Sequence, residues 1–126
     1  MKKLALSSLF SLMLFVPAMA HEGHHDESNE MRGKEISVKG EIVDMACYLD
    51  HNAMGPKHAE CAKTCIESGL PVGIRTEDGK VYLLIGEHKP MNKILAEYAA
   101  KTVTVKGKFV SRDGFNMVEN AEVLTK

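Results

Sequence analysis

Alternation of apolar and polar positions predicts five β-strands in this chain. The clearest run begins at Ile36, where Ile36, Val38 and Ile42 share one side of the strand. Two Asp-Gly turns, at Asp78 and Asp113, each separate a pair of such runs and are typical of hairpins. The expected strands cover residues 36–44, 72–76, 81–85, 102–110 and 115–124.

Two other segments have helical patterning. Pro56 suits the first position of a helix, and Gly69 suits the position just after its end. A second helix is expected over 90–100, where Ile94, Leu95 and Tyr98 fall on one apolar side. The order of elements is therefore strand, helical segment, two strands, helix, two strands.

This order predicts a mainly β fold: a five-stranded, OB-fold-like Greek-key barrel over residues 36–126. A cysteine-bearing helical insertion at 45–70 joins strands 1 and 2, and a helix lies between strands 3 and 4. Gly40 indicates a bend or bulge in the first strand. Four residues are expected in the core: Phe109, Phe115, Val118 and Val123.

The N-terminal 35 residues do not resemble part of the barrel. Residues 1–20 match a secretory signal peptide, with Lys2 and Lys3, an apolar stretch, and a small-residue cleavage site ending at Ala20. Residues 21–35 are polar and predict a disordered, His-rich leader. The mature chain is therefore expected in the periplasm or outside the cell, with no membrane span.

Composition narrows the partners. Sixteen basic and 17 acidic residues give a net charge of −1, and no basic patch for nucleic acid is evident. Three cysteines cannot all pair within one chain, so export to an oxidising compartment leaves one thiol for chemistry, metal binding or a link between chains.

All three cysteines lie in the insertion. His58, Cys61 and Cys65 have the three- and four-residue spacing that places side chains on one helix face, and Cys47 precedes that helix. A Cys61–Cys65 disulfide does not suit a regular helix, whereas Cys47 can reach either partner. Alternatively, Cys47, His58, Cys61 and Cys65 form a Cys3His set for one Zn(II) or Cu(I) ion.

Further residues are secondary candidates. Asp44 either orients a ligand or caps a turn, Met45 is either a thioether ligand or core filler, and His88 is expected on the surface. Secondary metal ligands are His21, His24 and His25 of the leader, His51 of the insertion, and the thioether of Met54.

Three functions remain open. The favoured interpretation is a non-enzymatic periplasmic metal-binding protein for carriage, sequestration or structural stapling, served by a metal-delivery partner protein. The second is a thiol–disulfide redox protein with its own redox partner, although a helix beginning before His58 places neither later cysteine in the N-terminal turn. The third is an exported binding module with one structural disulfide.

The motifs D-x-x-C-Y at 44–48, G-x-x-H-x-x-C-A-x-x-C at 55–65 and G-x-P-V-G at 69–73 resemble those of small exported bacterial OB-fold proteins. The C-terminal hairpin is similar to that of OB-fold domains of the tRNA-anticodon-binding type. The resemblance spans about residues 36–124 and implies the barrel rather than an activity. The C-x3-C pair with a histidine also resembles the ligands of copper chaperones for cytochrome oxidase assembly, on a different fold.

Overall fold

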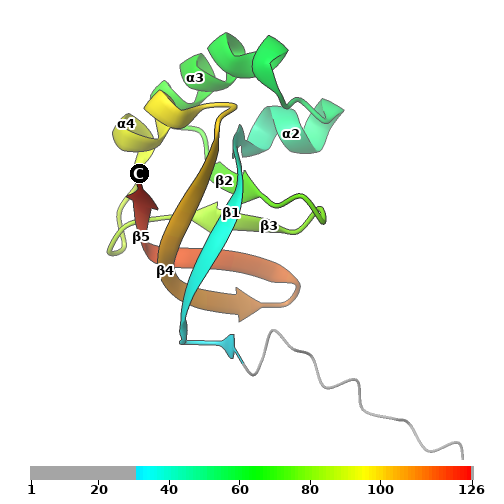
Figure 1. Ribbon diagram of the computed structural model, residues 1–126. Coiled ribbons are helices and arrows are strands. Elements are labelled where there is room, and N and C mark those ends of the chain that lie inside the picture. The colour runs from blue at the N-terminus through cyan, green and yellow to red at the C-terminus, as the bar shows by residue number, and fades with distance from the viewer. Residues whose placement is uncertain (1–30, 126) are drawn as a thin grey trace, which may run out of the picture.

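Five strands close into a barrel in the order β1-β2-β3-β5-β4 (Figure 1). The computed structural model describes residues 31–125. All strand pairs are antiparallel except β3 with β5, which is parallel. The predicted OB-fold-like barrel is confirmed. The strands are β1 (Glu35–Asp44), β2 (Val72–Arg75), β3 (Val81–Leu84), β4 (Thr102–Arg112) and β5 (Phe115–Leu124).

The insertion between β1 and β2 is helical, as predicted. It contains α2 (Met45–His51), the 3-10 turn η1 (Pro56–His58) and α3 (Ala59–Glu67). The helix expected between strands 3 and 4 is present as a short α4 (Asn92–Leu95) that continues into the 3-10 turn η2 (Ala96–Tyr98). Figure 1 shows α2, α3 and α4 gathered at one end of the barrel, so the cysteine segment lies over that end.

Apolar side chains from every strand fill the barrel. Ile42, Ile74 and Val118 are fully buried, and Phe109 is 2% exposed. The prediction that Phe115 enters the core is wrong, because it is 73% exposed. It directly follows the turn at Asp113 and Gly114, where the β4–β5 hairpin reverses. The other predicted core positions are confirmed: Phe109 and Val118 are buried, and Val123 is partly buried against the core.

Gly40 allows two strands to approach closely and does not form a bulge. The pairing of β1 with β4 runs without a register shift through Gly40. A Cβ atom at this position would collide with the backbone carbonyl oxygen of Arg75 and lie 2.7 Å from its carbonyl carbon. The next residue, Glu41, pairs with both Thr102 and Arg75, so Gly40 precedes the point where β1 meets both neighbours.

Defined structure begins a few residues earlier in the chain than the sequence suggests. Residues 31–34, assigned above to the leader, turn toward β4. The Gly33 N–H donates to the Phe109 carbonyl at 2.7 Å, and the Phe109 N–H donates to the Lys34 carbonyl at 2.8 Å. The predicted signal peptide and the leader histidines His21, His24 and His25 lie outside the described residues.

Candidate metal centre

Cys47 is positioned by a capped helix. Asp44, the last residue of β1, is the N-cap of α2, and its carboxylate accepts from the N–H groups of Ala46 at 3.1 Å and Cys47 at 3.0 Å. Asp44 is 2% exposed. The Met45 N–H also donates to the Pro71 carbonyl at 2.9 Å, which joins the start of α2 to the start of β2. Cys47 therefore lies in the first turn of a helix that is fixed to the barrel.

His58, Cys61 and Cys65 are placed by η1 and α3. Gly55 has a φ of 81° and leads into Pro56, which starts η1 as the sequence predicts. The α-helix itself begins at Ala59, with His58 at its N-cap, so Cys61 does lie in the first α-helical turn. The expectation that neither Cys61 nor Cys65 occupies such a turn is wrong for Cys61, because the segment starts as a 3-10 turn and becomes α-helical only at Ala59.

The four predicted ligands come together as two overlapping groups. Ligand atoms of Cys47, His58 and Cys61 all lie within 4.8 Å of one another, and so do those of Asp44, Cys47 and Cys65. Cys47 belongs to both groups, and its Sγ lies 4.0 Å from that of Cys65. The cluster thus joins α2 to α3 through three thiols and one imidazole.

His58, a member of this cluster, has an unsatisfied ring nitrogen. Its Nε2 is buried and, within residues 31–125, has no hydrogen-bond partner. A buried polar atom without a partner costs free energy, typically about 1–3 kcal/mol, unless another group satisfies it. An imidazole nitrogen beside two thiols is the arrangement that a soft or borderline metal ion would satisfy.

The thiols of Cys47 and Cys65 favour their protonated forms in the metal-free protein. The Asp44 carboxylate, burial and the Cys65 thiol together raise the pKa of Cys47 to about 12. Burial is the main cause that raises the pKa of Cys65 above its usual value, although the Cys47 thiol opposes it. A nucleophilic cysteine requires the opposite shift, since the thiolate is the reactive form. A metal ion would displace these protons and supply the positive charge that the cluster lacks.

Apolar packing and hydrogen bonds fix the segment independently of any ligand. Ala62 and Ile66 of α3 are buried in the barrel core. The Asn92 side chain donates to the carbonyls of Ile66 at 2.8 Å and Leu70 at 2.7 Å, so it ties the end of α3 to the start of α4. Arg75 Nε of β2 donates to the Tyr48 hydroxyl of α2 at 3.2 Å.

The secondary candidates occupy different places. His51 ends α2, and its ring lies 5.7 Å from that of His58 at an angle of 74°, while its Nδ1 lies 3.1 Å from Asp50 Oδ2. It borders the cluster without joining either group. Met54 is half-buried in the loop between α2 and η1, and its role as a ligand stays a prediction.

Met45 occupies a core position, and His88 occupies a surface position. Met45 is buried with its sulfur against Gly73, where a Cβ would collide with it, so it fills the core. His88 is on the surface, as predicted, with its side chain 85% exposed and its Nε2 3.3 Å from Glu119 Oε1.

The sequence did not predict α2 or the position of Asp44 inside the cluster. The signals were present: an Asp that suits an N-cap before Met45, and Asn52 after His51, which has the left-handed φ of 55° found at helix C-caps. The segment has only seven residues, too few for an apolar period to appear.

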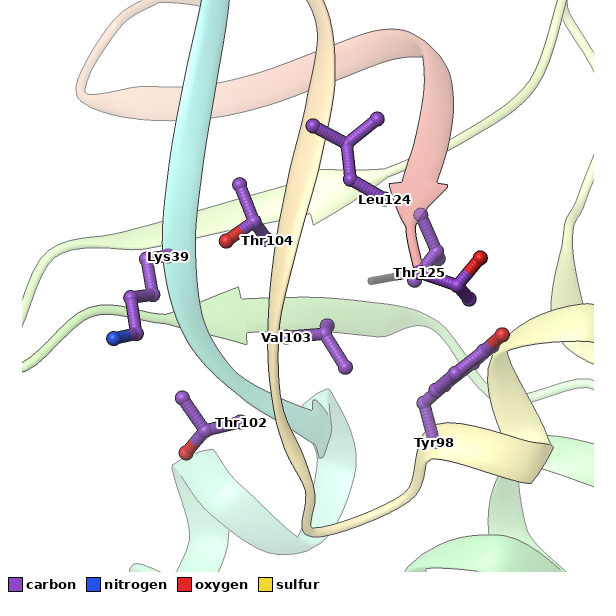
Figure 2. Close-up of a pocket in the computed structure, with 8 residues that line it drawn as sticks. Lys39, Tyr98, Thr102, Val103, Thr104, Leu124 and Thr125 are labelled. Carbon is purple, nitrogen blue, oxygen red and sulfur yellow. The ribbon is translucent and has the colours of Figure 1, made fainter.

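An open groove of about 550 Å³ lies elsewhere on the barrel (Figure 2). It runs between β1, η2, β4 and the end of β5, with Lys39, Tyr98 and Thr102 among its lining residues. No residue of the cysteine cluster lines it. Among the described helices, none is long and apolar enough to cross a membrane.

The fold and the cluster define a small β-barrel with a Cys/His group that could hold one metal ion. Comparison with known proteins adds no family to this class: no protein-family model matches the chain, and neither does any curated protein or solved structure.

Proposed function

We propose that this chain is an exported, periplasmic metal-binding protein that carries or sequesters one Cu(I) or Zn(II) ion through Cys47, His58, Cys61 and Cys65. The observation that carries the proposal is the buried, unpartnered Nε2 of His58, whose group includes the sulfur atoms of Cys47 and Cys61 within 4.8 Å. Nothing in the fold of the barrel requires a polar atom at that place.

The donor set and its spacing support this proposal. Three thiolates and one imidazole suit tetrahedral Zn(II), and thiolates also suit Cu(I). Two sulfurs bound to one zinc ion at about 2.3 Å in tetrahedral geometry lie roughly 3.8 Å apart. The Cys47–Cys65 sulfur separation of 4.0 Å is close to this value. Cys47 and Cys65 therefore already have the separation of two sulfurs on one ion.

Carriage or sequestration fits better than structural stapling. Cys61 is exposed, so an incoming ligand can reach the ion from solvent. Ile66 and Ala62 already anchor α3 in the core, so the segment has an apolar attachment that does not depend on metal. In many structural zinc sites the ion takes the place of an apolar core, and the folded state does not form without it.

The remaining parts of the proposal come from the sequence. The signal-like residues 1–20 support export to the periplasm, where His21, His24 and His25 of the leader collect or hand over metal. An exposed ligand also suits transfer to a delivery partner protein by ligand exchange. The raised pKa values of Cys47 and Cys65 weigh against the redox-enzyme alternative.

The test is a metal titration of the reduced mature chain under anaerobic conditions, followed by native mass spectrometry. Zn(II) and Cu(I) are added separately, against a competing chelator, so that stoichiometry and affinity identify the metal. The single variants Cys61→Ser, Cys65→Ser and His58→Ala are each expected to lower the affinity at least 10-fold, by analogy with the loss of supporting ligand contacts.

Two controls isolate the cluster. His88→Ala removes an exposed histidine that lies outside the cluster, and it is expected to leave the affinity unchanged. A variant with His21, His24 and His25 changed to Ala removes the leader ligands, and one high-affinity ion is expected to remain. Full affinity in all three cluster variants would exclude this site.

A further inference from the structure

The Cys47 sulfur can either bind a metal ion or form a disulfide with Cys65, but it cannot do both at once. Its sulfur belongs to the group with His58 and Cys61, and it also lies 4.0 Å from the sulfur of Cys65. We propose that the site is redox-gated: a Cys47–Cys65 disulfide forms in the metal-free protein and prevents metal binding, and reduction restores it. This inference rests on the proposed function and adds a regulation to the same site.

The shortest sulfur contact favours Cys47 with Cys65, at 4.0 Å, whereas the sulfurs of Cys47 and Cys61 lie within 4.8 Å without such a contact. Cys61 and Cys65 lie one turn apart in α3, where Cβ atoms are about 5–6 Å apart, whereas a disulfide needs roughly 3.8 Å. Cys47 lies on a different helix, 18 residues away from Cys65 in the chain, so no helix geometry holds their sulfurs apart. A disulfide bond of about 2.05 Å requires these sulfurs to approach by about 2 Å, which side-chain rotation can supply.

The frame around the pair is fixed on both sides. Asp44 caps the turn that carries Cys47, and Ile66, the residue after Cys65, is fully buried in the core. The sulfurs are therefore held near each other by the fold, with or without a metal ion. Cys61 is the exposed thiol, and it remains unpaired in the oxidised form.

The oxidant is a disulfide, either a low-molecular-weight one or that of a partner protein. One of the two cysteines attacks the disulfide R–S–S–R from the small fraction of molecules in which its thiol is ionised, forms a mixed disulfide and releases one RS⁻. The second cysteine then attacks the mixed disulfide, closes the Cys47–Cys65 bond and releases the other RS⁻. Two electrons pass from the two cysteines to R–S–S–R, and the two thiol protons leave with the products as two RSH.

The disulfide removes two of the four metal ligands at once, because neither sulfur remains a thiolate. His58 and Cys61 alone cannot complete a tetrahedral set. By linkage, a bound ion must protect Cys47 and Cys65 from oxidation to the extent that oxidation weakens binding of the ion. Metal loading and oxidation are therefore expected to oppose each other in a reciprocal way.

The test exposes metal-free and Zn(II)-loaded mature chain to oxidised glutathione under anaerobic conditions. The metal-free protein is expected to lose two hydrogens in mass, and peptide mapping should place the bond between Cys47 and Cys65, with Cys61 open to alkylation. The Zn(II)-loaded protein should keep three reduced thiols. The oxidised protein should bind Zn(II) at least 100-fold more weakly, and dithiothreitol should restore its affinity.

Cys61→Ser is the matched variant, since it removes the exposed thiol and leaves the proposed pair intact. It is expected to lose two hydrogens under the same conditions. A Cys47–Cys61 bond in the wild-type map, or no mass loss in this variant, would overturn the proposal. Undiminished Zn(II) binding by the oxidised wild-type chain would overturn the gating alone. Absence of both Zn(II) and Cu(I) binding by the reduced chain would overturn the proposed function and the gating together.

Discussion

The barrel interior and the cysteine segment follow opposite rules. Inside the barrel, Ile42, Ile74 and Val105 are completely buried and contribute no polar side-chain atom. In the segment over the end of the barrel, a buried histidine nitrogen has no partner and thiols gather beside it. The first region is built for stability, and the second accepts a cost in stability that a ligand can recover.

Two histidines show the same contrast within one residue type. His88 is exposed and lies 3.3 Å from the Glu119 carboxylate, so it has an ordinary partner. His58 has a buried nitrogen that faces no partner among the described residues. Residue type alone therefore does not identify a ligand: burial without a hydrogen bond distinguishes the functional candidate from the surface residue.

The largest effect is expected from breaking the barrel side of the comparison. Phe109→Ala removes a buried ring that packs edge-to-face on Tyr82, with ring centroids 5.9 Å apart. It should lower the free energy of unfolding by about 3–5 kcal/mol, measured by urea denaturation. Phe115→Ala is the matched control, and its 73% exposed ring should be worth less than about 0.5 kcal/mol. Similar losses in both variants would contradict the assignment of the core.

The next effect concerns the site and its dependence on pH. Cys47 must lose a proton to bind a metal, and its pKa is raised to about 12 by Asp44 first and by burial next. The apparent affinity should therefore rise about 10-fold per pH unit for each proton released, between about pH 6 and 8. Competition titrations at several pH values measure this slope. A flat profile would show that the thiols are already ionised.

The raised pKa of Cys47 also makes the stability of the metal-free protein depend on pH. Because folding raises the pKa of Cys47, the folded state is favoured while that thiol is protonated. This contribution is complete below the usual thiol pKa and is lost as the pH rises toward about 12. Asp44→Asn should weaken this effect on stability, since it removes the carboxylate that contributes most to the raised pKa of Cys47.

A smaller effect is expected from the cap that joins the two regions. Asp44→Ala removes the acceptor of two N–H groups at the start of α2. It should cost about 0.5–2 kcal/mol of stability in urea denaturation, whereas Asp44→Asn should cost less, because its single amide oxygen can replace one of the two carboxylate acceptors. Equal losses in the two variants would show that the charge of Asp44, rather than its capping bonds, is what the fold uses.

The sequence predicts the barrel better than the site, for a physical reason. Alternation over Ile36 to Asp44 and the two Asp-Gly turns repeat along the chain, so each strand is indicated several times. The exposure of Phe115 could not be inferred in this way, because a hairpin that extends past the barrel keeps its alternation where no core remains. Alternation predicts on which side of a strand a residue lies, but not whether that part of the strand packs against the core.

For the site, the spacing of His58, Cys61 and Cys65 predicts a shared helix face; Cys61 and Cys65 do lie four residues apart in α3, whereas His58 is its N-cap at the end of η1. The role of Cys47 depends on α2, which has too few residues to show a helical period. The pairing of Cys47 with Cys65 depends on how α2 and α3 meet over the barrel. Such contacts between elements are set by tertiary packing, and one sequence does not contain them in readable form.

The smallest effect is expected at Asp78 in the β2–β3 turn. This charge stabilises only the barrel, so it contrasts with the charges of the cysteine segment. The Thr76 hydroxyl donates to the Asp78 carboxylate, and this bond is the main cause that lowers the Asp78 pKa. A lowered pKa stabilises the fold above the usual carboxyl pKa, and the benefit disappears as the pH falls through the folded value. Asp78→Asn should therefore be slightly less stable than wild type at pH 7 and equal to it in acid, by thermal melts across pH. Glu77→Gln, which removes a charge of the same sign from the same turn, is the control and should show no such convergence. Metal affinity should not change in either variant, because neither Asp78 nor Glu77 belongs to the cluster.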